Sequence, residues 1–257
     1  MRAYALLLLL LTLPVWAVPQ PGFLERTSES EVIFLGESHT SKADHEGQLA
    51  VLELLAETQE KPLVVVCEMF NELAEVDLEE ILSQPKSPRF QKFWEAQWGH
   101  PFELYQPIFR WAQKSGHTLA PLRPDPARAR LVKKEGPQAL LDPLGEFFLG
   151  PVAYRDHMRA IVADHMPEGN PPPEEMVDSF FLVQCFWDEY MSWRLAHLAQ
   201  EYPGHTLVVL VGHGHLYNEF GIPLRLRRRA PQLKLLTVGF KENAGWNPDI
   251  VFALPLE

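Results

Sequence analysis

The sequence predicts an α/β fold, with a mainly parallel β-sheet flanked by helices and an inserted helical subdomain. Short apolar runs rich in β-branched residues recur without polar alternation, which is typical of strands covered on both faces. Helical patterns separate the first of these runs, as in right-handed βαβ units. A long segment with helical character but no convincing strand pattern interrupts the series. These features predict one α/β domain with a helical insertion.

The predicted strands are apolar runs, several of which end at a glycine or run into a charged residue. They cover residues 31–36, 63–67, 117–122, 205–212, 234–240 and 249–254.

Helix signals follow the first two runs. Ser41 to Asp44 form a capping-box pattern, and apolar residues then recur at helical spacing from Leu49 to Ala56. Asn71 is the predicted N-cap of a second helix over residues 73–82. Residues 126–200 carry about three further helical stretches around the Gly/Pro loop 169–173, and we assign them to the helical subdomain.

The N-terminus has the pattern of a secretory signal peptide over residues 1–17. Arg2 supplies the positive charge, residues 6–13 form a short apolar run, and a small-residue cleavage site ends at Ala17. The run is short for a membrane span, and no later stretch is long and apolar enough for one. The alternatives are an uncleaved anchor or a core helix. With no cysteine near the cleavage site, we expect a soluble exported protein, periplasmic or secreted, that is not a lipoprotein.

Composition narrows the possible functions. The chain has 257 residues, of which 46% are hydrophobic, so it can form a substantial core. A formal charge of −11 disfavours nucleic-acid binding, which needs a basic face. Cys67 and Cys185 both lie in apolar runs, where a thiol is usually a core residue. Whether they pair is left open, because spacing gives no geometry.

Charged residues directly follow three of the predicted strands. The first leads into Glu37 and His39, the second into Glu68, and the fourth into His213 and His215. In an open parallel sheet, ligands bind beyond the carboxyl ends of the strands. The sequence therefore predicts a polar site at this edge.

Two kinds of chemistry fit these residue types. His39, Glu68, His215 and His213 could bind a divalent metal ion with an open position for water. Alternatively, a catalytic set of Glu37, His39, Glu68 and His215 could activate water without a metal. His45 could reach this site from the first helical turn, or it could cap the helix.

Two further clusters each have two interpretations. The arginines at 225 and 227–229 form either a solvated helix face or a site for carboxylates or phosphates. The aromatic-rich stretch from Phe180 to Trp193 forms either core or the lining for a planar apolar ligand.

The motifs resemble a known superfamily. GESH at 36–39 and GHGH at 212–215 share the form G-x-x-H, and they occur with CEMF at 67–70, WDEYM at 187–191 and GHLYNEFGIP at 214–223. This set resembles the superfamily that joins ChaN, Tiki proteases, TraB proteins and erythromycin esterases, and it is most similar to the ChaN branch. The resemblance makes residues 18–257 a ChaN-like domain.

The resemblance carries functional expectations. The ChaN branch implies an exported haem-binding protein in iron uptake, whose homodimer encloses haem. Haem ligation by tyrosine in that branch makes candidates of Tyr154, Tyr190 and Tyr217, with His157 nearby. Tiki-like relatives imply a metal-dependent peptidase, and the esterases imply a hydrolase that uses Glu and His on water; the shared site residues are Glu37, His39, Glu68 and His215.

We therefore expect a haem- or metal-binding protein whose partner is haem or another small molecule. The alternative is a water-activating peptidase or esterase. A third hypothesis keeps the fold as a binding scaffold with a vestigial site.

Overall fold

The computed structural model describes residues 22–74, 78–140, 144–167, 170–240 and 246–252. The predicted signal peptide, residues 1–17, lies outside the described residues. None of the described helices combines the length and apolar composition needed to span a bilayer.

The centre of the molecule is a six-stranded sheet in the order β3-β2-β4-β1-β5-β6, in which every described strand pair is parallel. The predicted α/β class is confirmed. The strands are β1 (Val32–Glu37), β2 (Leu63–Asn71), β3 (Thr118–Arg123), β4 (Thr206–Gly212), β5 (Leu235–Gly239) and β6 (Ile250–Val251).

The strand order brings distant parts of the sequence together. β4 lies between β1 and β2, with Glu37 beside Gly212 on one side and Cys67 beside Leu210 on the other. The carboxyl ends of the three strands therefore lie at nearly the same level. A residue that follows any one of them is a near neighbour of those that follow the other two.

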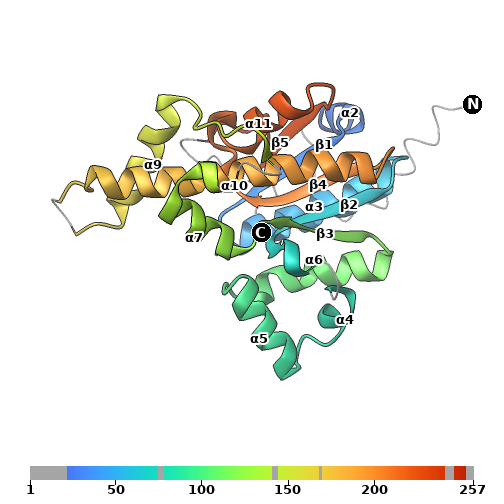
Figure 1. The fold of residues 1–257 in the computed structure, drawn as a ribbon. Coiled ribbons are helices and arrows are strands. Elements are labelled where there is room, and N and C mark those ends of the chain that lie inside the picture. The colour runs from blue at the N-terminus through green and yellow to red at the C-terminus, as the bar shows by residue number, and fades with distance from the viewer. Residues whose placement is uncertain (1–21, 75–77, 141–143, 168–169, 241–245, 253–257) are drawn as a thin grey trace, which may run out of the picture.

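One face of the sheet is covered by α3 (Lys42–Thr58) together with α5 (Pro88–Gln97) and α6 (Phe102–Ser115) (Figure 1). As predicted, α3 starts after Ser41, whose hydroxyl oxygen accepts a hydrogen bond from the Asp44 amide at 3.3 Å. Strand residues such as Ile33 and Val65 pack into this core.

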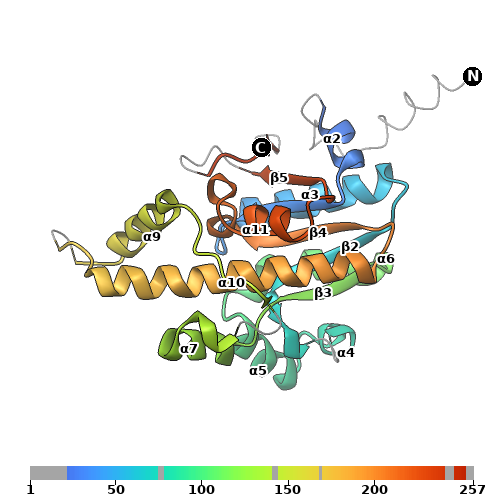
Figure 2. The same ribbon diagram turned by 45° about the horizontal axis from the view of Figure 1, so that its top comes forward.

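The other face is covered by α11 (Ile222–Arg229) and the second half of α10 (Glu174–Glu201) (Figure 2). Here the alternate strand residues, such as Phe34 and Val66, meet Leu195 of α10. Because helices cover both faces, β1, β2 and β4 are buried along their whole length. This explains why their sequences lack polar alternation.

The segment around residue 75 differs from the prediction. β2 continues to Asn71, a 3₁₀ turn, η1, follows at Glu72–Ala74, and α4 covers Leu78–Ser83, while residues 75–77 of the predicted helix lie outside the described residues. The Asn71 side chain accepts a hydrogen bond from the Leu73 amide at 3.0 Å, so it closes a turn rather than capping a helix over 73–82.

The described residues between 126 and 201 contain no strand. They form α7 (Pro126–Glu135), the 3₁₀ turn η2 (Pro137–Leu140), α9 (Val152–Asp164) and α10. We call α9 and residues 174–185 of α10 the helical arm, because they extend beyond the sheet (Figures 1 and 2). At 28 residues α10 is about 42 Å long, so one helix belongs to both the arm and the sheet layer.

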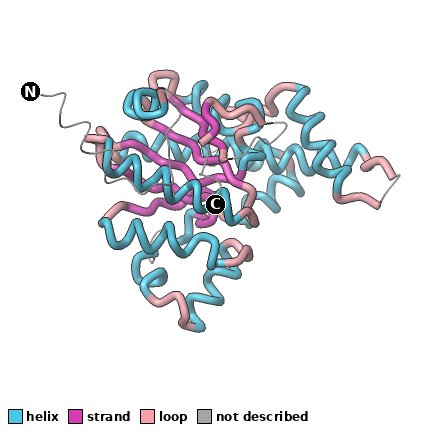
Figure 3. Tube along the Cα trace, turned by 180° about the vertical axis from the view of Figure 1, so that it is seen from behind, coloured by secondary structure: helices cyan, strands magenta, loops and turns pink. Residues whose placement is uncertain are grey.

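The remaining described elements are α2 (Phe23–Glu29), which precedes β1, and the 3₁₀ turns η3 (His213–His215) and η4 (Tyr217–Glu219), which lie between β4 and α11. Figure 3 shows the helices wrapped around the strands from the opposite side. Cys67 and Cys185 are both buried, unpaired thiols in the described structure.

We predict that Gly221→Ala destabilises the protein strongly. A Cβ atom at Gly221 would lie 2.0 Å from the carbonyl oxygen of His215, so the backbone after β4 would have to move. The expected loss is about 3 kcal/mol or more of unfolding free energy, measured by urea denaturation. Gly214→Ala is the matched control, since its Cβ meets nothing within 4 Å. Equal stability of the two variants would contradict this packing.

Candidate functional site

The carboxyl ends of β1, β2 and β4 bring Glu37, Glu68, His39 and His215 together, as the sequence predicts. Glu37 is the last residue of β1 and Glu68 lies in β2, and each is only 1% exposed. His215 ends η3, directly after β4, and is 6% exposed. Both carboxylates are therefore charges that the fold must compensate internally.

Glu37 is compensated by two histidines and a tyrosine. Its Oε1 accepts a hydrogen bond from the Tyr105 hydroxyl at 2.8 Å and lies 3.0 Å from His39 Nδ1. His45 Nδ1 lies 3.2 Å from Oε2, in poor geometry, so Oε2 lacks a hydrogen bond among the described residues. Burial raises the pKa of Glu37, but the contacts with His39 and His45 outweigh it and hold this pKa below its usual value.

His39 is the most exposed member of the site. Its side chain is 33% exposed, and its ring lies edge-on to Trp98 at 4.8 Å between ring centroids. Burial lowers the pKa of His39, while the bond to Glu37 and the charge of Glu68 raise it more, so the pKa lies above its usual value. Glu37 thus orients this imidazole at the open side of the site.

His215 lies between two carboxylates. Its Nε2 lies 3.4 Å from Glu68 Oε1, and its Nδ1 lies 2.6 Å from Asp188 Oδ1. Burial lowers the pKa of His215, but Glu68 and Asp188 raise it to about 10. Burial also raises the pKa of Glu68, but His215, His39 and the Gly212 amide, which donates at 2.6 Å, lower it to about 2.

Asp188 connects the site to the helical arm. Its Oδ2 accepts a hydrogen bond from the Tyr154 hydroxyl at 2.9 Å and lies 3.8 Å from Arg225 NH1. Arg225 is fully buried and also donates to the carbonyls of Phe148 and Phe220 at 2.7 Å. The orientation of His215 therefore depends on α9, α10 and α11 together.

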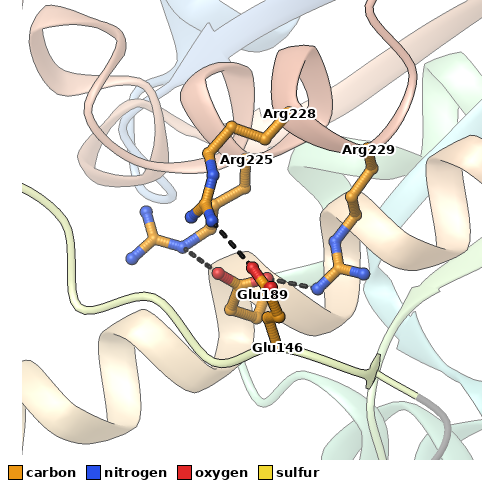
Figure 4. A pocket seen from close by; sticks show the side chains of 5 residues that line it. All are labelled: Glu146, Glu189, Arg225, Arg228 and Arg229. Atoms are coloured by element: carbon orange, nitrogen blue, oxygen red, sulfur yellow. Dashed lines mark hydrogen bonds and ion pairs between the residues drawn. The ribbon is translucent and has the colours of Figure 1, made fainter.

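The arginine cluster of α11 is an ion-pair network. A cavity of about 220 Å³ is lined by Glu146, Glu189, Arg225, Arg228 and Arg229 (Figure 4). Arg228 lies 3.1 Å from Glu146, Arg225 Nε lies 3.4 Å from Glu189, and Arg229 also pairs with Glu189. Because each of these three arginines faces a carboxylate, the cluster joins α10, α11 and the loop before α9 that carries Glu146.

Two predicted histidines have supporting positions. His213 Nδ1 lies 2.9 Å from the carbonyl oxygen of Glu37, so this ring bonds to the β1 backbone. His45 lies beneath Glu37, with its Nε2 3.2 Å from the His39 carbonyl oxygen. Among the described residues, no group of three or more His, Cys, Asp or Glu side chains is arranged to hold a metal ion. The divalent-metal site of His39, Glu68, His215 and His213 stays a prediction.

The tyrosine candidates lie in different environments. Tyr154 and Tyr190 are buried, and the Tyr190 hydroxyl donates to Glu72 Oε2 at 2.7 Å. Tyr217 and His157 are half-buried and stack on each other, with ring centroids 3.4 Å apart and an interplanar angle of 3°. The structure thus brings only the last two together.

Sequence reasoning missed several residues of the site, namely Tyr105, Asp188, Arg123 and Trp98. Asp188 had a usable signal, because it is an acid within the apolar and aromatic stretch of α10 and within the WDEYM motif. Tyr105 and Trp98 belong to the α5–α6 segment, which carries no recognisable motif.

The fold and the site together define a parallel α/β protein with a buried Glu/His cluster at the carboxyl ends of its strands. The family model described as haem-binding uptake, Tiki superfamily, ChaN matches residues 23–226, and the chain belongs to this family. No curated protein matches the sequence.

Solved structures share the fold. ChaN of Campylobacter jejuni, described as binding haem cofacially, is 16% identical, with 93% of each chain covered and a TM-score of 0.73. The type III effector HopBA1 is 14% identical over 92% of this chain and 95% of its own, with a TM-score of 0.51. An erythromycin esterase mutant in its open conformation is 11% identical over 90% of this chain and 77% of its own, with a TM-score of 0.50.

We predict that stability contributed by His215 declines between pH 6.5 and about 10. Its pKa is raised in the folded protein, so the stabilisation is complete below pH 6.5 and is lost as the pH rises to about 10. The measurement is the difference in unfolding free energy between the native protein and His215→Gln across this range. A difference that stays constant with pH would contradict the charged assignment.

We also predict that Asp188→Asn lowers the unfolding free energy by about 3 kcal/mol, because it leaves His215 and Arg225 with one carboxylate fewer in a buried setting. Glu175→Gln is the control, since this residue is exposed on the same helix. Equal stability of the two variants in chemical denaturation would show that Asp188 does not support the site.

Proposed function

We propose that this protein is an exported haem-binding protein that serves haem or iron uptake. Membership of the ChaN family supports haem as the ligand. The observation in this chain that supports it best is the accessible stack of Tyr217 on His157. Both residue types are axial ligands of haem iron in proteins.

Of the three candidate tyrosines, all within the described residues, Tyr217 fits a haem ligand best. The hydroxyl groups of Tyr154 and Tyr190 donate to the carboxylates of Asp188, which is buried, and Glu72, so neither is available to iron. Within the described residues, no hydrogen bond engages the Tyr217 hydroxyl or the His157 ring nitrogens. We therefore assign the haem-ligand role to Tyr217, with His157 as its neighbour.

The neutral form of His157 suits its place beside Tyr217, because it puts no positive charge next to a ferric haem. Burial and the nearby His213 both lower the pKa of His157, so its imidazole is neutral at neutral pH and keeps a nitrogen lone pair. When bound, haem would supply a ferric centre that accepts a phenolate or imidazole ligand. Tyr217 would give its phenolate oxygen, and His157 would pack on the phenol ring and exclude water from it.

Tyr217 packs against an apolar cluster that includes Met158 and Phe181, and the helical arm exposes further apolar side chains. Six large apolar side chains are exposed in the described part of the chain, and four belong to the helical arm or the loop before it. These four are Leu149, Val152, Met176 and Phe180. Contiguous exposed apolar surface typically marks a ligand or protein interface.

A second copy of the chain would cover this surface. The arm extends from the sheet layer, so two arms could enclose haem between two subunits without displacing either core. We therefore propose a homodimer whose formation is strengthened by haem. Its mass can be measured by light scattering with and without haemin.

Export is the second part of the proposal. Cleavage after Ala17 would leave a chain that starts at Val18, in the periplasm or the medium. The intact mass of the protein recovered from those fractions checks this. Recovery of the uncleaved chain in the membrane fraction would contradict export.

Titration with haemin should give a saturable Soret shift, and Tyr217→Phe should weaken binding at least tenfold, because the variant removes the proposed iron ligand. Tyr190→Phe is the matched control and should bind as the native protein does, since its hydroxyl already bonds to Glu72. The absence of a saturable shift, or a loss confined to Tyr190→Phe, would sink the haem assignment.

A water-activating hydrolase is the second candidate, and the orientation of His39 by Glu37 favours it. This acid–imidazole pair resembles the base of hydrolytic triads in its chemistry. A Cβ atom placed on Gly212 would lie 3.1 Å from His39 Nε2 and 3.5 Å from Glu68 Oε2, so one point at this edge is close to both. A water molecule bound beside these two side chains would meet a base and a carboxylate, with His215 available to stabilise negative charge.

An ester and peptide panel, run with and without a chelator, tests this candidate. A substrate turned over by the native protein should lose at least a hundredfold in rate with His39→Asn, because the base is removed. Inactivity across the panel, with haem binding intact in a His39→Ala, His215→Ala double variant, would instead support a vestigial site on a binding scaffold.

A further inference from the structure

Arg123 forms a cationic clamp beside the Glu/His site. It is the last residue of β3, pairs in register with Asn71 of β2, and is 7% exposed. Its guanidinium carbon lies 5.0 Å from the ring centroid of Trp98 and 5.7 Å from that of Trp187. Two indoles from different helical segments therefore hold one cation by cation–π contact.

Polar groups of the clamp are left without acceptors. Arg123 NH2 donates to the Gln97 carbonyl, but Arg123 Nε and Trp187 Nε1 are buried and make no hydrogen bond among the described residues. The Trp98 indole N–H interacts with the Tyr105 hydroxyl without reaching good hydrogen-bond geometry. A buried donor without an acceptor costs stability, so each such group calls for an explanation.

The clamp shares its walls with the functional site. Trp98 lies edge-on to His39, and Trp187 stacks on His215 with 6.1 Å between centroids and a 15° interplanar angle. Glu68 attracts the Arg123 guanidinium. A ligand held by the clamp would therefore lie against the rings that flank both catalytic candidates.

We propose that Arg123, with the Trp187 indole N–H, binds a carboxylate group of the ligand. Arg123 Nε and Trp187 Nε1 offer two donors, which matches the two oxygens of a planar carboxylate. A single negative charge also matches the single guanidinium. A phosphate dianion would be repelled more strongly than a carboxylate by the ionised Glu68 nearby, so the arrangement disfavours it.

Two sources could supply such a carboxylate. One is a haem propionate, and the other is the carboxylate of a separate small molecule bound at the Glu/His site. The recognition chemistry is the same in both cases. The proposed role of Arg123 therefore does not depend on whether Tyr217 binds haem or His39 acts in hydrolysis.

Benzoate tests the clamp directly, with neutral benzamide as the matched ligand. The readout is the indole N–H signals in two-dimensional NMR, where Trp98→Phe and Trp187→Phe assign two of the seven tryptophans. Benzoate should give a saturable shift of the Trp187 signal, whereas benzamide should give none. Arg123→Gln should weaken benzoate binding at least tenfold, and Arg110→Gln, an exposed charge on α6, should leave it unchanged.

Arg123→Lys provides a second variant in case Arg123→Gln does not fold. It keeps the charge but loses the planar guanidinium, so it should bind benzoate severalfold more weakly than the native protein. Any of three results would overturn the proposal. They are benzoate binding that does not saturate, an equal response to benzamide, and benzoate binding by both Arg123 variants as tight as that of the native protein.

Haemin and haemin dimethyl ester then distinguish the two sources. Weaker binding of the ester than of haemin, with the difference abolished in Arg123→Gln, would assign the clamp to a propionate. Equal binding of both, together with Arg123-dependent benzoate binding, would assign it to a separate carboxylate ligand. Loss of haem binding in Tyr217→Phe with benzoate binding retained would show that the two sites are independent.

Discussion

The burial of two ionised carboxylates, Glu37 and Glu68, is the constraint on which the rest of the site depends. Each lies 1% exposed on a strand whose two faces are covered by helices. An unpaired charge in such a place would be strongly destabilising. The fold compensates Glu37 with His39 and Glu68 with His215, and it then compensates His215 with Asp188.

This chain of compensation explains why the helical arm and the sheet form one unit. Asp188 belongs to α10 and is contacted by Tyr154 of α9 and Arg225 of α11. Replacing buried ion pairs by apolar residues is often neutral or stabilising, so stability alone gives little reason for such a network. We interpret it as a device that fixes the imidazoles of His39 and His215 beside a ligand. The accessible Tyr217–His157 stack and the Arg123 clamp lie on segments joined by the same network.

The fold class and part of the Glu/His site could be predicted from the sequence, because both leave a signal within a few neighbouring residues. Strands covered on both faces must be apolar, so a charged or imidazole side chain close after one is conspicuous, and this pattern predicted Glu37, Glu68 and His215 as site residues. Tyr105, Asp188 and Arg123 were not, because they reach the site from segments whose placement depends on long-range packing. The predicted N-cap at Asn71 of a helix over 73–82 was wrong for a different reason, since the Asn71 side chain closes a turn at the end of β2. The arginines of α11 could not be interpreted until Glu146 and Glu189 were known to face them.

The most direct test of this account is the ionisation of Glu68, measured from the ¹³C shift of its side-chain carboxyl during an acid titration. We predict that Glu68 stays ionised until the pH approaches about 2, because His215, His39 and the Gly212 amide favour its charged form. A midpoint at or above its ordinary value of 4.5 would contradict it. The site would then be a neutral hydrogen-bonded cluster rather than a paired set of charges.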